Sequence, residues 1–140
     1  MRAINYFVIT RTELDSFAIT EESFKRGMMY PAPHMLVHKD DPEAKLYSMA
    51  RMRPMSERCA NIRDSELNNT GYGIVVRCSS KDMDAALKRA VGIVIKSVAD
   101  DIGIKDYQIV SDEVNEDNFV DTFELSSIIA TIPSIFNKRI

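Results

Sequence analysis

A strand, a long helix and a second strand follow one another between residues 71 and 110, and this unit constrains the fold more than any other part of the chain. Gly71–Cys78 is rich in β-branched residues, as expected for a buried strand. Ser80 or the serine before it can cap the helix, and Gly103 can close it in the left-handed conformation. Tyr107–Val110 supplies the second strand. The sequence therefore predicts a β-α-β unit at about 72–110, with a right-handed crossover if the strands are parallel.

The predicted helix is apolar on more than one side. Its main stripe has the three-four spacing of an amphipathic helix, and a second apolar set lies off that stripe. One sheet can cover the main stripe only, so we expect something else to shield the second set. The main stripe comprises Met83, Leu87, Val91, Val94, Ile95, Val98 and Ile102, and the second set comprises Ala86, Ala90 and Ile93.

The first half of the chain contains two further predicted strands and a short helix. Ala3–Thr10 is dense in β-branched and aromatic residues and is expected to be a largely buried strand. Thr20 can cap a short helix that stops at Gly27, and the Pro31-Ala32-Pro33 run cannot continue a helix. His34–His38 then has the pattern of a short strand.

Residues 42–53 fit two structures. Pro42 at a first helical position, after an aspartate cap, favours a helix. The run Lys45–Arg53 also alternates between two faces, which would make a hairpin with the preceding strand. Helix has the better start signal, and the hairpin remains its rival.

Residues 119–125 also fit two structures. Phe119, Phe123 and Leu125 suit either a helix that runs on to Ile132 or a strand before a short helix. Pro133 would end the helix. Together the elements predict an α+β fold, in which one small mixed sheet of three to five strands is covered on one face by two long helices.

The length and composition indicate one domain spanning residues 1–140. With 140 residues and 45% hydrophobic side chains, the chain is long enough to bury a single core. No stretch has the roughly twenty apolar residues of a membrane helix, and the N-terminus lacks the apolar run of a secretory signal. Cys59 and Cys78 are not in a C-x-x-C pair, so we expect a reducing, cytoplasmic setting and no membrane partner.

Charge is distributed unevenly along the chain. Residues 24–63 contain eight Lys and Arg against four acidic residues, whereas residues 100–124 contain nine acidic residues against Lys105 alone. This polarity could attract an anionic partner to one face or let copies of the protein stack basic face to acidic face. Two solvated surfaces would explain it equally well.

Three patterns could carry catalytic chemistry, and none is complete. His34 and His38 share a side of a strand or helix, which would be half of a metal site. The Glu43-Ala44-Lys45 triplet occurs in magnesium-dependent nucleases, although here it lies in a predicted cap or turn. Cys78 ends a strand ahead of a helix start, where a thiolate can be stabilised. The sequence thus predicts no catalytic residue, metal or cofactor, and an enzyme is the less favoured class.

The segment from residue 45 to residue 63 has the most unusual local composition. Methionine and arginine, both enriched at interfaces, are interleaved with a tyrosine. The same arginines and the tyrosine ring could hold the phosphates and bases of RNA or single-stranded DNA, although the net charge of −3 opposes nonspecific binding. A methionine-filled edge of the core would also account for the pattern. The candidate binding residues are Tyr47, Arg51, Met52, Arg53, Met55, Arg58 and Arg63.

These observations lead to three functional hypotheses. The leading one is a non-catalytic binding or assembly protein that acts through protein–protein contacts, with itself as a homo-oligomer or with another protein. The alternative is an RNA or single-stranded DNA binding protein that uses the basic 45–63 segment. The third is a small metal-dependent or cysteine-based hydrolase.

Overall fold

A five-stranded mixed sheet forms the centre of the computed structural model, which describes residues 3–12, 34–39, 43, 45–58, 69–77, 84–111 and 122–134. The strands lie in the order β3-β2-β4-β1-β5. Four of them are parallel, and β3 pairs antiparallel with β2 at one edge. The strands are β1 (Tyr6–Thr12), β2 (Met35–His38), β3 (Ser48–Arg51), β4 (Gly71–Arg77) and β5 (Gln108–Ser111).

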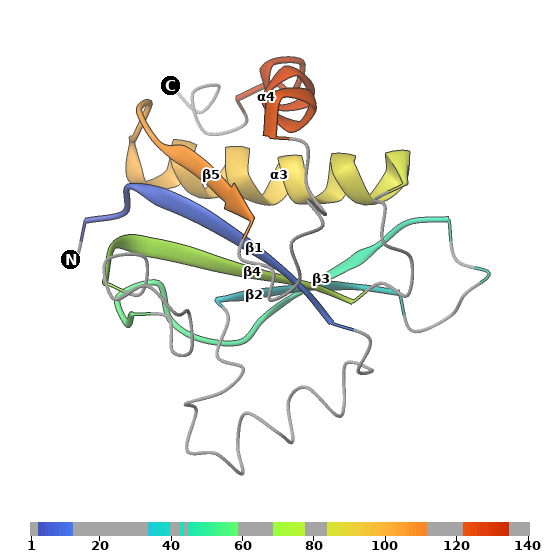
Figure 1. Ribbon diagram of the computed structural model, residues 1–140, viewed down its shortest axis with the longest axis horizontal. Coiled ribbons are helices and arrows are strands. Elements are labelled where there is room, and N and C mark those ends of the chain that lie inside the picture. Colours follow the sequence, from blue (N-terminus) through green and yellow to red (C-terminus); the bar gives the residue numbers. More distant parts are fainter. Residues whose placement is uncertain are drawn as a thin grey trace, which may run out of the picture.

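Two helices lie on the same side of this sheet (Figure 1). Helix α3 (Ala85–Ile102) runs along the sheet, and α4 (Thr122–Ala130) packs on α3. The predicted α+β class, the strand count and the cover of helices on one face are therefore confirmed. No helix among the described residues is long and apolar enough to cross a membrane.

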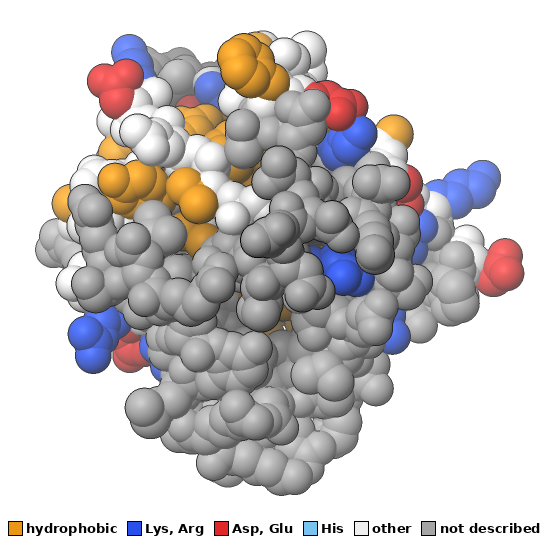
Figure 2. Space-filling view, viewed as in Figure 1, with side chains coloured by type: hydrophobic (Ala, Val, Ile, Leu, Met, Phe, Trp, Pro, Cys, Tyr) orange, Lys and Arg blue, Asp and Glu red, His pale blue; other side chains and the backbone are white. Residues whose placement is uncertain are grey.

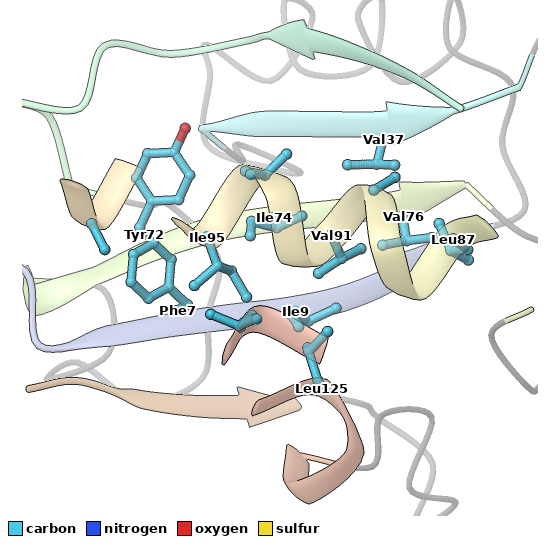
Figure 3. Close-up of a cluster of buried hydrophobic side chains, with 14 of the residues drawn as sticks. Phe7, Ile9, Val37, Tyr72, Ile74, Val76, Leu87, Val91, Ile95 and Leu125 are labelled. Carbon is cyan, nitrogen blue, oxygen red and sulfur yellow. The ribbon is translucent and has the colours of Figure 1, made fainter. Parts of the chain in front are cut away.

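The core lies between α3 and the sheet. Its side chains come from alternate positions of β1, β2 and β4, from the main stripe of α3 and from Leu125 of α4, as Figure 3 shows. Because the inner strands of a parallel sheet are covered on both faces, they carry near-continuous apolar runs, and the first six residues of β4 are all buried. The labelled members of this cluster are Phe7, Ile9, Val37, Tyr72, Ile74, Val76, Leu87, Val91, Ile95 and Leu125.

Helix α4 packs on α3 at Gly92, which is not a member of the second apolar set. Ala90 is buried, and a Cβ built on Gly92 would meet Ile132 at 3.2 Å and Ile129 at 3.5 Å. The two helices therefore approach closely at a glycine, and α3 is packed between the sheet and α4. Of the second set, Ala90 is buried, whereas Ile93 is half-buried and lines a groove beside the hairpin of β2 and β3, so the described residues cover this side of α3 only in part.

Three local predictions are settled by the described elements. The hairpin of β2 and β3 is present, so the helix favoured for residues 42–53 is wrong: burying β2 as an inner strand outweighed the helical start signal at Pro42. Residues 122–130 are helical, and Pro133 follows that helix. The cap predicted at Ser79 or Ser80 is also wrong, because Asp84 caps α3 by accepting a hydrogen bond from Leu87 N at 2.7 Å.

The other end of α3 and the β-α-β unit follow the sequence prediction. Gly103 closes the helix with φ 76°. β4 and β5 are parallel, with β1 inserted between them. The predicted helix at Thr20–Gly27 and the connector at Pro31–Pro33 lie outside the described residues.

Candidate functional site

The topology singles out one edge of the sheet. The carboxyl ends of β1, β2, β4 and β5 meet at this edge because these strands are parallel. From β1 the chain passes over to β2, whereas from β4 it passes through α3 to β5, in the opposite direction along the sheet. In open sheets of this kind, ligands bind outside the carboxyl ends of the strands, where the direction of the connections reverses. The reversal here lies between β4 and β1.

Two polar side chains end the neighbouring strands β2 and β4. The register pairs Val37 with Val76, so the next residues, His38 and Arg77, come side by side at about the 5 Å spacing of adjacent strands. His38 is 8% exposed. Arg77 donates from Nη1 to the backbone oxygen of Lys39 at 3.0 Å. Its Nε is buried and has no hydrogen-bond partner in the part of the chain that the structure describes.

A second set of contacts ties the hairpin to the start of α3 at the same edge. Tyr47 donates from its hydroxyl to Asp84 Oδ2 at 3.3 Å, and Lys39 Nζ lies 4.6 Å from the centre of the Tyr47 ring. Asp84 also caps α3, so one carboxylate joins the helix N-terminus to the hairpin. The carboxyl edge thus combines a histidine, two cationic groups and a helix N-terminus.

At the opposite edge, His34 is fully buried and holds structure. Its Nδ1 accepts a hydrogen bond from Gly73 N at 2.9 Å, and its Nε2 donates to the Glu57 carbonyl oxygen at 2.6 Å. Its ring stacks on Tyr72 with centres 4.8 Å apart. Both ring nitrogens are therefore engaged in joining the loop after β3 to β4.

The proposed half-site of His34 and His38 for a metal ion is wrong. His34 directly precedes β2 and His38 ends it, so their Cα atoms lie about 13 Å apart. Both ring nitrogens of His34 are already bound to backbone groups, which leaves neither to ligate a metal ion. Within the described ranges, no three His, Cys, Asp or Glu side chains gather as a metal site would require.

Beside His34, a groove of about 580 Å³ opens between the hairpin and the second half of α3. Four methionines line it, together with two arginines, Tyr72 and the last turns of α3. The methionines are Met35, Met49, Met52 and Met55, and the arginines are Arg51 and Arg53.

The structure places the predicted binding residues in two groups. Arg51, Met52, Arg53 and Met55 line the groove, and Arg53 donates to the Arg58 carbonyl oxygen at 2.9 Å. Tyr47 lies at the other end of β3, at the carboxyl edge, and so is separated from the arginines it was expected to serve. Arg63 and Cys78 lie outside the described residues, and of the nuclease-like triplet only Glu43 and Lys45, both exposed, are described.

Sequence reasoning did not single out Arg77, which the structure places beside His38. A signal was present, since Arg77 is a cation that ends an otherwise buried strand. Its meaning depends on the strand order, because only the pairing of β2 with β4 brings Arg77 next to His38.

No protein-family model matches this chain, and no curated protein matches it. Among solved structures, the N-acetylmuramoyl-L-alanine amidase LysC from Clostridium intestinale URNW has a similar fold, with a TM-score of 0.67 and 15% sequence identity. The similarity covers 94% of this chain and 88% of that one. At this identity the likeness establishes the fold alone.

The comparison overturns the expectation of a non-catalytic binding or assembly protein. A solved structure with a similar fold is an amidase, so the fold gives no ground for a non-catalytic role. The expectation had drawn on the two apolar sides of the predicted helix, on the charge polarity and on the methionine and arginine segment. Neither self-association nor RNA binding gains support from the comparison.

Proposed function

We propose that this chain is a hydrolase that cleaves an amide bond at the carboxyl edge of its parallel strands. The observation that carries the proposal is the placement of His38 beside Arg77 at the carboxyl edge, where Arg77 ends β4, one of the two strands between which the connections reverse. The likeness in fold to an amidase supports this reaction class over other hydrolytic reactions.

The two side chains have complementary uses in amide hydrolysis. Imidazole is the commonest general base in enzymes, so His38 would take a proton from the attacking water and return it to the departing amine. The water oxygen bonds to the carbonyl carbon, the carbon–nitrogen bond breaks, and the products are a carboxylic acid and an amine. Arg77 would stabilise, through its guanidinium charge, the oxyanion that develops on the carbonyl oxygen.

The name of the structural neighbour supplies the substrate that we propose first. That protein is an amidase of N-acetylmuramoyl-L-alanine, so the bond to test is the amide between an N-acetylmuramoyl group and L-alanine. The cytoplasmic setting expected from the cysteines remains part of the proposal and is tested by cell fractionation.

The test measures release of the free amine from an N-acetylmuramoyl peptide by the purified protein and by three variants. His38→Gln is expected to lower kcat by about 100-fold or more, the usual contribution of a general base. Arg77→Gln is expected to lower kcat by about 100-fold, as for loss of one oxyanion donor. The matched control is Arg89→Gln, an exposed arginine of α3, which should stay within about twofold.

Two results would contradict the proposal. The first is release of amine no faster than without the protein. The second is hydrolysis that His38→Gln and Arg77→Gln leave unchanged while circular dichroism shows them folded.

A further inference from the structure

The groove at the amino edge is a second site, distinct from the carboxyl edge where we place hydrolysis. It lies beside Met35 and Tyr72, at the start of β2 and β4, whereas His38 and Arg77 end those strands. Its volume of about 580 Å³ is within the range of small-ligand sites. We propose that it binds a short peptide of apolar residues whose amino and carboxyl ends are both free.

The apolar part of this ligand is argued from the walls. The methionines of the hairpin and its following loop form one wall, and Ile93, Val94 and Val98 of α3 form the other. Met49 is 41% exposed although it is apolar. Methionine side chains adapt to differently shaped apolar groups, so such walls accept several aliphatic side chains rather than one.

The free ends of the ligand are argued from the charges at the rim. Arg51 and Asp101 line the same groove and are both exposed. Neither forms an ion pair with another described residue. A carboxylate therefore has a cation to bind and an ammonium has an anion. A fatty acid would satisfy only one of the two, which is why we infer a peptide.

Arg53 has a different role, because it is already held in place. Its side chain is 10% exposed, its Nε lies 3.5 Å from Glu57 Oε2, and its Nη1 donates to the Arg58 carbonyl oxygen. The loop that follows β3 is further tied by His34 through the Glu57 carbonyl. The wall that carries Arg51 is thus fixed before a ligand binds, which reduces the entropy lost on binding.

The test uses the dipeptide Leu-Leu as the probe, with methyl-labelled methionine followed by NMR. Leu-Leu should shift the methyl signals of the four groove methionines, each assigned by a Met→Leu variant. Leu-Leu amide and N-acetyl-Leu-Leu, which lack one charge each, should bind at least about fivefold more weakly. Gly-Gly should not bind, because it cannot fill the apolar walls.

Matched variants separate the two ends of the peptide. In Arg51→Gln, Leu-Leu and its amide should bind alike, whereas in Asp101→Asn, Leu-Leu and its acetylated form should bind alike. Lys105→Gln, an exposed cation that does not line the groove, should bind Leu-Leu like the unaltered protein. Since the exchanged side chains are exposed, folding should be retained, and circular dichroism checks it.

The proposal is overturned if Leu-Leu at about 10 mM leaves the groove methionines unshifted. It is also overturned if Leu-Leu, its amide and its acetylated form bind equally. Neither result depends on hydrolysis at the carboxyl edge, so the two sites stand or fall separately.

Discussion

One of the two histidines of this protein lies just before strand β2 and the other ends it, and their neighbours differ. His34, at the amino edge, is fully buried and uses both ring nitrogens to hold backbone groups. His38, at the carboxyl edge, lies beside Arg77, whose buried Nε has no hydrogen-bond partner among the described residues. The comparison teaches that one histidine holds backbone groups together at the amino edge, whereas the other lies beside a cation at the edge where we propose catalysis.

Replacing His34 should have the largest effect on stability. His34→Ala leaves Gly73 N and the Glu57 carbonyl without partners and opens a cavity, so we expect a loss of about 3 kcal/mol in the free energy of unfolding. Urea denaturation measures it. If His34 were catalytic instead, His34→Ala would remove activity at unchanged stability, and the contrast between the two edges would fail.

The two ends of α3 offer a smaller test, since its N-terminus lies at the carboxyl edge and its C-terminus at the amino edge. Asp84→Ala removes the cap and the Tyr47 contact and should cost about 1 kcal/mol. Gly103→Ala should lower the free energy of unfolding by about 1 kcal/mol. The cause is backbone strain at φ 76° alone, since no atom lies near enough to clash with the added Cβ.

Thermal unfolding of both variants checks these values. If hydrolysis falls in Asp84→Ala and not in Gly103→Ala, the two edges differ in function as proposed, because only Asp84 lies at the proposed active edge. Equal loss of activity in both variants would indicate a general effect of the helix rather than of its N-terminal end.

The smallest effect concerns Tyr107, which lies just before β5 and against Phe7. Burial, and then the nearby Asp100 carboxylate, raise the pKa of Tyr107 above its ordinary value of 10.0. A folded-state pKa above the unfolded one means that the stabilisation is present below about pH 10 and is lost as the pH rises through the folded pKa. Asp100→Asn should lower the pKa of Tyr107 only in part, because burial of the phenol still raises it.

Ultraviolet absorbance of the tyrosinate form measures this titration, and Tyr107→Phe identifies the signal among the five tyrosines. An unchanged titration in Asp100→Asn would show that burial alone acts on the phenol.

Much of the fold could be predicted from local signals. Local sequence patterns predicted three features, because each depends on neighbouring residues. They are the strand at residues 71–77, the left-handed end of α3 at Gly103 and the two apolar sides of that helix. The N-cap was misplaced because several residues before α3 are suitable caps, and local propensity does not rank them. The choice between helix and hairpin at residues 42–53 depended on pairing with β2, a contact that no local signal encodes.

The candidate site was less predictable than the fold. Of the residues predicted to bind a partner, Arg51, Met52, Arg53 and Met55 line one groove and Tyr47 lies at the other end of β3. Their role in binding stays a prediction. A strand is an extended chain, so two residues four apart in sequence lie at opposite edges of a sheet whose strands are this short. The same geometry separated His34 from His38.

The sequence by itself determined which segments are buried strands and which helix must be covered on two sides, because hydrophobic periodicity is a property of the chain. Only the tertiary structure decided that α4 packs on α3 at Gly92, that Arg77 lies beside His38, and that Arg51 shares a groove with Asp101. The physical reason is that strand order and helix packing join residues far apart in sequence, and those contacts, rather than local propensity, bring polar groups together into a site.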